Sequence, residues 1–225
     1  MILFEEVSKS YGRNITAVAN ISFKINTGEF VFLVGPSGAG KTTVLRLIDR
    51  EILPSTGSVI VDDWEVNKLP KSKLAFLRRK VGFVFQDFKL LTDRTVGENI
   101  AVSLEILNKN RQEIDKRINQ VLNIVRLEDK INYFPRQLSL GEQQRIAIGR
   151  AIAGEAKVLL ADEPTGNLDP KTSWEILKII NKINKEGTTV LMASHNVDIV
   201  NSLKKRVIAL NKGQLVRDKE QSRYS

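Results

Sequence analysis

The feature that most constrains this chain is a short apolar run followed at once by a glycine-rich loop and then a helical stretch. The apolar run is Phe30–Val34, the loop carries the pattern GxxxxGK[ST], and helical spacing continues through residues 43–50. Glycines in such a loop let backbone N–H groups converge on phosphate oxygens, and the helix N-terminus adds its positive end. Lys41 can reach the terminal phosphates of a nucleotide and Thr42 can ligate Mg²⁺. The strand and helix beside it favour this interpretation over a chance glycine-rich turn. The residues expected to hold the nucleotide here are Gly35, Pro36, Ser37, Gly38, Ala39, Gly40, Lys41, Thr42 and Thr43.

Alternating apolar and helical segments predict the fold class. The apolar, β-branched runs after the opening lie at 30–34, 81–85, 158–161, 188–192 and 207–210. Their alternation with longer helical stretches predicts an α/β fold with a mixed, largely parallel core sheet. Short strand-like runs in the opening, at 2–7, 21–25 and 58–61, predict an antiparallel β subdomain beside that sheet. Helical spacing between 96 and 127 predicts a helical subdomain of about 87–155 within one domain, 1–225. The residues after Val216 are expected to form a loose polar tail.

Composition excludes several classes of protein. With 42% hydrophobic and 27% charged residues, the chain reads as a globular protein. It has no apolar run near the ~20 residues that cross a bilayer, and Glu5 and Glu6 stand where a signal peptide would be basic. Zero cysteines exclude disulfide partners and thiolate metal sites. The net charge of +9 suits a nucleic acid or an anionic membrane face, and charge alone does not choose between them.

Three further strand ends carry polar side chains suited to phosphate chemistry. Asp162 and Glu163 follow the apolar run at 158–161, and the chain's one histidine, His195, follows another. Because the carboxyl ends of parallel strands face one crevice, Asp162 can hold Mg²⁺ through water and Glu163 can polarise the attacking water. His195 can contact the γ-phosphate or that water. Gln86, after the run at 81–85, can contact both Mg²⁺ and water. The alternatives are helix-capping acids at a strand-ending turn and an ordinary surface histidine.

These motifs, in this order, resemble the ATPase subunits of ABC transporters over essentially the whole chain. Against that family, 35–42 resembles Walker A, Gln86 the Q-loop, 138–143 the signature, 160–163 the end of Walker B, 167–169 the D-loop and His195 the switch histidine. Tyr11 matches the aromatic residue that stacks on adenine, although a tyrosine packed on the small sheet is the alternative. The resemblance assigns Ser139, Gly141 and Glu142 to nucleotide contact, and a plain N-cap at the start of a helix is the alternative.

One position departs from the family pattern. The signature is usually LSGGQ, and here Leu140 stands at its first glycine, while Glu142 replaces the commoner glutamine. A side chain at Leu140 can shift the loop or lower the affinity for the γ-phosphate. Ser139 and Gly141 keep the family's main phosphate contacts.

The resemblance also implies partners and a location. It implies ATP and Mg²⁺ as ligands and a head-to-tail homodimer in which Walker A of one copy faces the signature of the other. Residues 76–88 and 90–96 are most similar to the cell-division ATP-binding subunits of the family. Their partner is an FtsX-like polytopic membrane protein, which regulates cell-wall hydrolysis. Phe88, Leu90 and Leu91 become candidate partner contacts, with burial in the helical subdomain as the alternative. The expected place is the cytoplasm, on the inner face of the cell membrane.

Other functions remain open on the sequence. The ATPase subunit of a lipoprotein-release or macrolide-type exporter would share the enzyme class but have another partner. A nucleic-acid-handling ABC protein has only the basic charge in its favour, and 225 residues leave no room for that group's coiled-coil insertions or second domain. A binding module without hydrolysis is disfavoured because Lys41, Asp162, Glu163 and His195 occur together.

Overall fold

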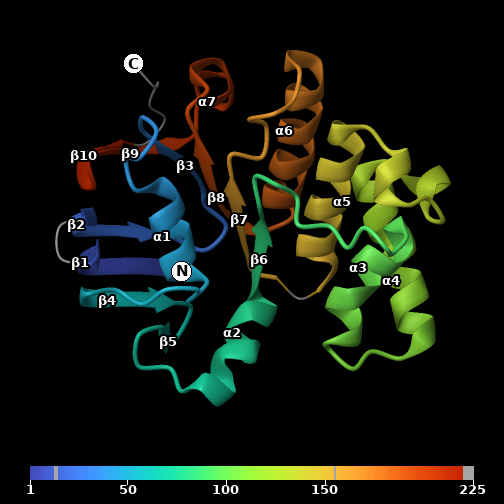
Figure 1. Ribbon diagram of the computed structural model, residues 1–225, viewed down its shortest axis with the longest axis horizontal. Coiled ribbons are helices and arrows are strands. Elements are labelled where there is room, and N and C mark those ends of the chain that lie inside the picture. The colour runs from blue at the N-terminus through green and yellow to red at the C-terminus, as the bar shows by residue number, and fades with distance from the viewer. Residues whose placement is uncertain (13–14, 155, 220–225) are drawn as a thin grey trace.

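The computed structural model describes residues 1–12, 15–154 and 156–219, and its centre is a six-stranded sheet (Figure 1). The strand order is β10-β9-β3-β8-β7-β6, parallel throughout except that β10 runs antiparallel to β9. β3, β7 and β8 are buried along their whole length, as the apolar runs predict for a sheet covered on both faces. The predicted mixed, largely parallel sheet is therefore confirmed. The bounds are β3 Phe30–Val34, β6 Val81–Val84, β7 Val158–Asp162, β8 Thr189–Ser194, β9 Arg206–Asn211 and β10 Gln214–Lys219.

A four-stranded antiparallel sheet covers one face of the central sheet. Its order is β2-β1-β4-β5, with several irregularities of register along β1. The apolar side chains of this sheet share one core cluster with the helix α1 and with one face of β3, β7 and β8. The opening strands thus form the predicted antiparallel layer, although β1 and β2 are longer than the apolar runs suggest. The bounds are β1 Ile2–Tyr11, β2 Ile15–Ile25, β4 Thr56–Val61, β5 Trp64–Glu65 and α1 Lys41–Ile48.

Helices cover the opposite face of the central sheet and form a second core cluster with it. α3, α4 and α5 each begin with a capping box, in which side chain and backbone at the two ends of the first turn bond reciprocally. β6 and α5 approach closely because position 82 is glycine: a Cβ there would lie 2.3 Å from the carbonyl oxygen of Ala151. The bounds are α2 Leu74–Lys80, α3 Val96–Glu105, α4 Arg111–Val125, α5 Leu140–Ala153, α6 Pro170–Lys185 and α7 Val197–Leu203, with 3-10 turns at Lys71–Lys73, Glu128–Lys130 and Pro135–Gln137.

The loose tail expected after Val216 is wrong for the residues that the structure describes. β10 continues to Lys219 because its backbone pairs with β9 and because Arg206 binds Asp218 through two contacts of 2.7 and 2.8 Å. The rest of the expected tail, 220–225, lies outside the described residues. Within the described part of the chain, no helix is both long and apolar enough to span a bilayer.

Candidate nucleotide site

The glycine-rich loop connects the carboxyl end of β3 to α1 and has no room for extra side-chain atoms. Gly35 and Gly40 both have positive φ. A Cβ at Gly35 would lie 2.2 Å from the carbonyl oxygen of Leu210, and one at Gly40 would lie 2.5 Å from that of Ala17. The Lys41 side chain is almost fully buried and folds back over the loop, where Nζ donates hydrogen bonds to Gly35 (2.8 Å) and Pro36 (3.1 Å). The loop thus holds an ammonium group ready to meet an anion.

The two acids and the histidine meet the loop at the same edge of the sheet. Glu163 Oε1 lies 3.4 Å from Lys41 Nζ, and Glu163 Oε2 lies 3.0 Å from His195 Nδ1. Thr42 Oγ1 donates a hydrogen bond of 3.2 Å to Asp162 Oδ1. The strand order explains this meeting, since β8 lies between β3 and β7 and the carboxyl ends of all three strands lie together. Five of the predicted site residues therefore form one cluster.

Backbone geometry and charge both distinguish this cluster. Glu163 adopts a left-handed conformation (φ 46°), and its N–H donates to the carbonyl of Ala193 on β8 (3.1 Å), which fixes where its side chain starts. Burial raises the pKa of the Asp162 carboxyl above its usual range, and the negative Glu163 adds to this. The Thr42 hydroxyl and the cations of Lys41 and Arg46 oppose the rise. A cation next to Asp162 would offset the cost of keeping this carboxylate charged.

Two predicted residues stand apart from the cluster. Gln86 is exposed in the loop after β6, two residues past the strand end, and has no hydrogen bond within the part of the chain that the structure describes. Tyr11 ends β1, is 40% exposed, and carries the ammonium of Lys9 5.3 Å from its ring centroid. Its ring face is therefore partly available to a base. The adjoining strand β2 reaches the phosphate-binding loop, where Ala17 lies against Gly40.

The signature residues begin α5, on the opposite face of the central sheet from α1 (Figure 1). The Ser139 hydroxyl accepts a hydrogen bond from the Glu142 N–H (3.3 Å), and the Glu142 carboxylate accepts bonds from the Ser139 N–H (2.9 Å) and hydroxyl (2.8 Å). Partial burial opposes the charge on Glu142, but these bonds hold its pKa below the usual range. In this copy Ser139 and Glu142 cap α5 and do not contact Lys41 or Glu163.

Gly141 and Leu140 differ sharply in their surroundings. A Cβ on Gly141 would lie 2.4 Å from Thr172 Cγ2, so a glycine is needed for α5 to pack against α6. Leu140 is 52% exposed and takes no part in the capping box. The departure from the family pattern thus leaves the start of the helix intact and presents an apolar side chain on its surface.

The segment after Gln86 packs largely against the protein's own helices. Phe88 and Leu90 pack against the protein's own core, as the alternative interpretation held, and Leu91 is 40% exposed. Arg150 of α5 donates hydrogen bonds to the carbonyls of Lys89 (2.6 Å) and Phe88 (2.8 Å), which fixes the segment after Gln86 to the helices. Arg150 lies among the apolar residues of α5, and a cation in such a setting is the one signal that sequence could have offered.

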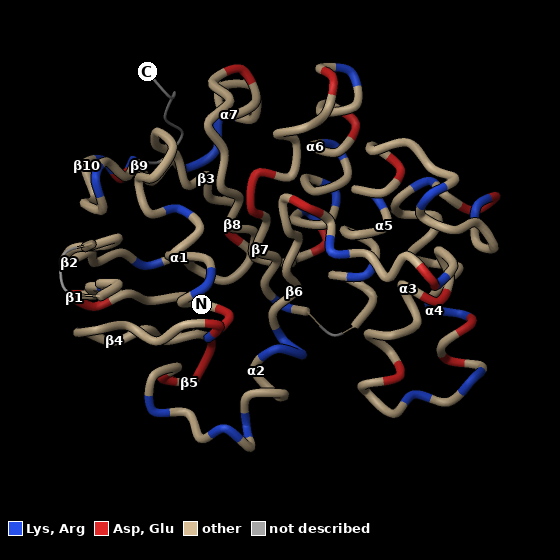
Figure 2. The backbone as a smooth tube through the Cα atoms, in the orientation of Figure 1, with Lys and Arg blue, Asp and Glu red and all other residues tan. Residues whose placement is uncertain are grey.

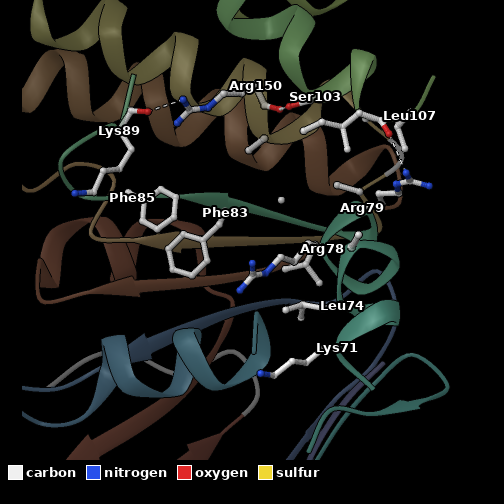
Figure 3. A pocket seen from close by; sticks show the side chains of 17 residues that line it. Lys71, Leu74, Arg78, Arg79, Phe83, Phe85, Lys89, Ser103, Leu107 and Arg150 are labelled. Carbon is white, nitrogen blue, oxygen red and sulfur yellow. Dashed lines mark hydrogen bonds between the residues drawn. The ribbon is translucent and has the colours of Figure 1, made fainter. Parts of the chain in front are cut away.

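A pocket of about 700 Å³ lies between α2, β6 and the helices α3 and α5 (Figure 3). Phe83 and Phe85, whose rings stack with centroids 4.3 Å apart, form part of its apolar wall. It lies beside the Gln86 loop and away from the Lys41–Glu163 cluster, none of whose members line it. The pocket is therefore a second candidate site, suited to an apolar occupant.

A strand, phosphate-binding loop and helix joined to a carboxylate pair and a histidine define an ATP-hydrolysing protein of the P-loop class. The ABC transporter family model matches residues 18–166, and the chain belongs to this family as one of its ATPases. The cell division ATP-binding protein FtsE of Bacillus subtilis (strain 168) is 49% identical over 224 residues, covering 100% of this chain and 98% of that protein. FtsE of Mycobacterium tuberculosis is 47% identical, with 100% and 98% covered. The dimeric post-hydrolysis structure of the ATP-binding cassette MJ0796 bound to ADP and Pi is 35% identical, with a TM-score of 0.89 and both chains fully covered.

Proposed function

We propose that this chain is the ATP-hydrolysing subunit of a cell-division complex, in which two copies close on ATP and act on a membrane-embedded partner of the FtsX type. The observation that carries the chemistry is the cluster of Lys41, Glu163 and His195, joined by contacts of 3.4 and 3.0 Å. The full-length relatives named as cell division ATP-binding proteins support the biological setting.

The proposed roles follow from the position of each side chain. Lys41 and the backbone N–H groups of the loop bind the β- and γ-phosphates of ATP, in place of the carbonyl contacts that Lys41 now makes. Glu163 accepts a proton from the attacking water, and His195, held by Glu163, orients the γ-phosphate. The exposed ring of Tyr11 stacks on the adenine. Gln86 reaches the same water from its loop.

The residues present fit a magnesium ion. The Thr42 hydroxyl and the Asp162 carboxylate are two oxygen donors already in contact, and hard oxygen ligands are those that Mg²⁺ prefers. Burial raises the pKa of Asp162, and a neighbouring cation would stabilise the charged form of this carboxyl. When bound, Mg²⁺ neutralises phosphate charge. Thr42 and Asp162 would hold it, and Gln86 would complete the set from the loop after β6.

Dimerisation supplies what one copy lacks. Ser139, Gly141 and Glu142 stand across the central sheet from Lys41, so in this proposal they contact ATP bound to the second copy. Head-to-tail pairing of two copies brings the start of each α5 to the opposite nucleotide, where the helix N-terminus stabilises negative charge on the γ-phosphate.

The test uses Glu163→Gln, which keeps the shape of the side chain but removes its basicity. Hydrolysis should fall by roughly 10²- to 10⁴-fold, while ATP-dependent dimers accumulate on a sizing column. The matched control is Glu175→Gln, an acid that binds Arg145 outside the cluster, which should keep the parent rate. Hydrolysis at the parent rate by Glu163→Gln would show that Glu163 is not the general base, and His195 would become the next candidate for that role.

The membrane partner is proposed to dock in the pocket between α2 and α5 rather than on Phe88 or Leu90, which pack inward. Ala75→Trp would fill this pocket from the exposed surface of α2, and Ser72→Trp adds the same bulk outside it. Membranes with and without the FtsX-like partner are washed with rising salt. Apolar docking resists salt, whereas attraction to lipid headgroups is screened. The pocket is supported as the docking site if the protein stays on partner-containing membranes at high salt and if only Ala75→Trp loses this retention. Retention that is equal on both membranes and vanishes with salt would refute the proposal that the protein has a dedicated membrane partner.

A further inference from the structure

The charged side chains known to line the docking pocket are basic. Among the lining residues that the structure describes, five are basic and none is acidic. Figure 2 shows basic positions in blue along the segment that leads from β5 into α2. Such a lining attracts a negative group into an otherwise apolar space. The basic lining residues are Lys71, Arg78, Arg79, Lys89 and Arg150.

Three of these cations are already engaged in holding the walls of the pocket. Arg79 donates to the carbonyl of Ile106 (2.9 Å), and Arg150 donates to the carbonyls of the loop after β6. Lys89 pairs with Asp87 at 2.7 Å. Lys71 has no ion pair within the described part of the chain, and Arg78 has only long contacts. Arg78 and Lys71 are therefore the cations available to an occupant.

Arg78 joins the pocket to the nucleotide site. Its Nε lies 3.4 Å from the carbonyl oxygen and 3.6 Å from Oδ2 of Asp49, the residue that ends α1. α1 begins at Lys41, so its eight residues, about 12 Å of helix, separate Arg78 from the phosphate-binding loop. In Figure 3 Arg78 reaches into the pocket from α2, on the same side as Leu74 and Lys71. One side chain thus lines the pocket and also contacts the C-cap of the helix that begins at Lys41.

The contact between Arg78 and Asp49 can be exchanged. Arg78 is 45% exposed, and its contacts with Asp49 are longer than those of a good charge-assisted hydrogen bond. A carboxylate entering the apolar pocket could bind the guanidinium by two short bonds away from water, the geometry that arginine favours. Burial raises the pKa of Asp49 to about 6, with Arg78 opposing and Glu51 adding to the rise, so the environment of Asp49 changes when Arg78 turns away.

On the basis of the docking function proposed above, we infer that the partner segment that enters this pocket carries an aspartate or glutamate that binds Arg78 and draws it away from the end of α1. The effect of docking is then transmitted through α1 to the phosphate-binding loop. The pocket selects an apolar segment bearing an acid, and Arg78 is a positioning residue for ATP hydrolysis, which it affects through Asp49 and α1.

Binding of the purified FtsX-like partner in detergent, with partner-dependent ATP turnover, tests the inference. Arg78→Gln should weaken binding by roughly tenfold or more, and Arg78→Lys should recover part of it. Lys73→Gln, an exposed cation of the same segment outside the pocket, is the matched control and should bind as the parent does. Asp49→Asn should keep partner binding but reduce the change in turnover that the partner causes.

A charge swap identifies the acid. Each cytoplasmic Asp or Glu of the partner is changed to Arg and paired with Arg78→Glu. Recovery of binding at one position supports the inference, and recovery at none overturns it. Equal binding by the parent and Arg78→Gln would also overturn it while leaving the docking function standing. Failure of the parent chain itself to bind the partner would refute the docking function.

Discussion

Replacing Gly141 with alanine tests whether the signature glycine serves packing within this chain. A Cβ at that position would lie 2.4 Å from Thr172 Cγ2, more than 1 Å inside the usual ~3.5 Å carbon–carbon separation. Overpacking of this kind costs about 1–3 kcal/mol. Alanine in a helix without such a clash gains about 0.5–1 kcal/mol over glycine. Gly141→Ala alone should therefore destabilise the chain by up to about 2.5 kcal/mol, from the difference of these two terms.

The matched background is Thr172→Ser, because it removes the clashing methyl and nothing else. The Cβ and Oγ1 of position 172 would remain at 3.7 and 3.8 Å from the new Cβ, which are ordinary contacts. In that background Gly141→Ala should become neutral or stabilising. Urea unfolding of the four proteins gives the coupling directly, provided that the dependence on urea concentration is unchanged. The same loss of stability from Gly141→Ala in both backgrounds would refute the packing argument.

ATP turnover of the same four proteins separates packing from chemistry. If Gly141 serves only to let α5 and α6 approach, the double variant should regain the activity lost in the single one. The proposed contact with the nucleotide of the second copy predicts a different result, since a Cβ would still intrude there. Recovered folding with low turnover would then assign Gly141 to the dimer interface as well.

Three further predictions concern single side chains. Lys41→Ala should lose ATP binding, measured by calorimetry, because phosphate charge is left uncompensated, and undiminished turnover would contradict the loop's role. Asp49 has a folded-state pKa of about 6 against 3.8 unfolded, so it destabilises the fold as pH rises through this range. Asp49→Asn should therefore gain stability relative to the parent from pH 4 to 7, by at most ~3 kcal/mol, and a flat difference in urea unfolding would rule this out. Leu140→Gly should cost less than about 1 kcal/mol at this exposed position and lower the KM for ATP, whereas an unchanged KM would clear Leu140 of hindering the nucleotide.

The sequence predicts the cluster at the nucleotide site because each member follows a short apolar run. Asp162, Glu163 and His195 need only the rule that parallel strands end together, and that rule places them beside Lys41. The sequence does not predict which atoms meet. Thr42 and Asp162 are 120 residues apart, and their bond depends on the order in which β3, β8 and β7 pair. The left-handed backbone at Glu163 likewise has no sequence signal, since most residues with that conformation are glycine or asparagine.

The segment after Gln86 shows why surface contacts are harder to predict than strand ends. An apolar residue in a loop reads the same whether it packs on its own core or on a partner, so Phe88 and Leu90 became candidate contacts although both pack inward. The pocket proposed in their place is formed by α2, β6 and α5, and the glycine at position 82 lets β6 and α5 approach closely. Its lining comes from segments far apart in sequence, and no local pattern marks it.

The signature residues at the start of α5 lie across the central sheet from Lys41 of the same chain. α1 and the start of α5 belong to different core clusters on opposite faces of one sheet. A rearrangement that brought Ser139 to Lys41 of the same chain would have to break one of these clusters, each built from more than twenty buried side chains. At about 1.5–3 kcal/mol per large buried side chain, such a change exceeds the stability of any single domain. A second copy can present Ser139 without disturbing either core, so the proposed contact of Ser139 with ATP favours a head-to-tail dimer over a rearrangement within one chain.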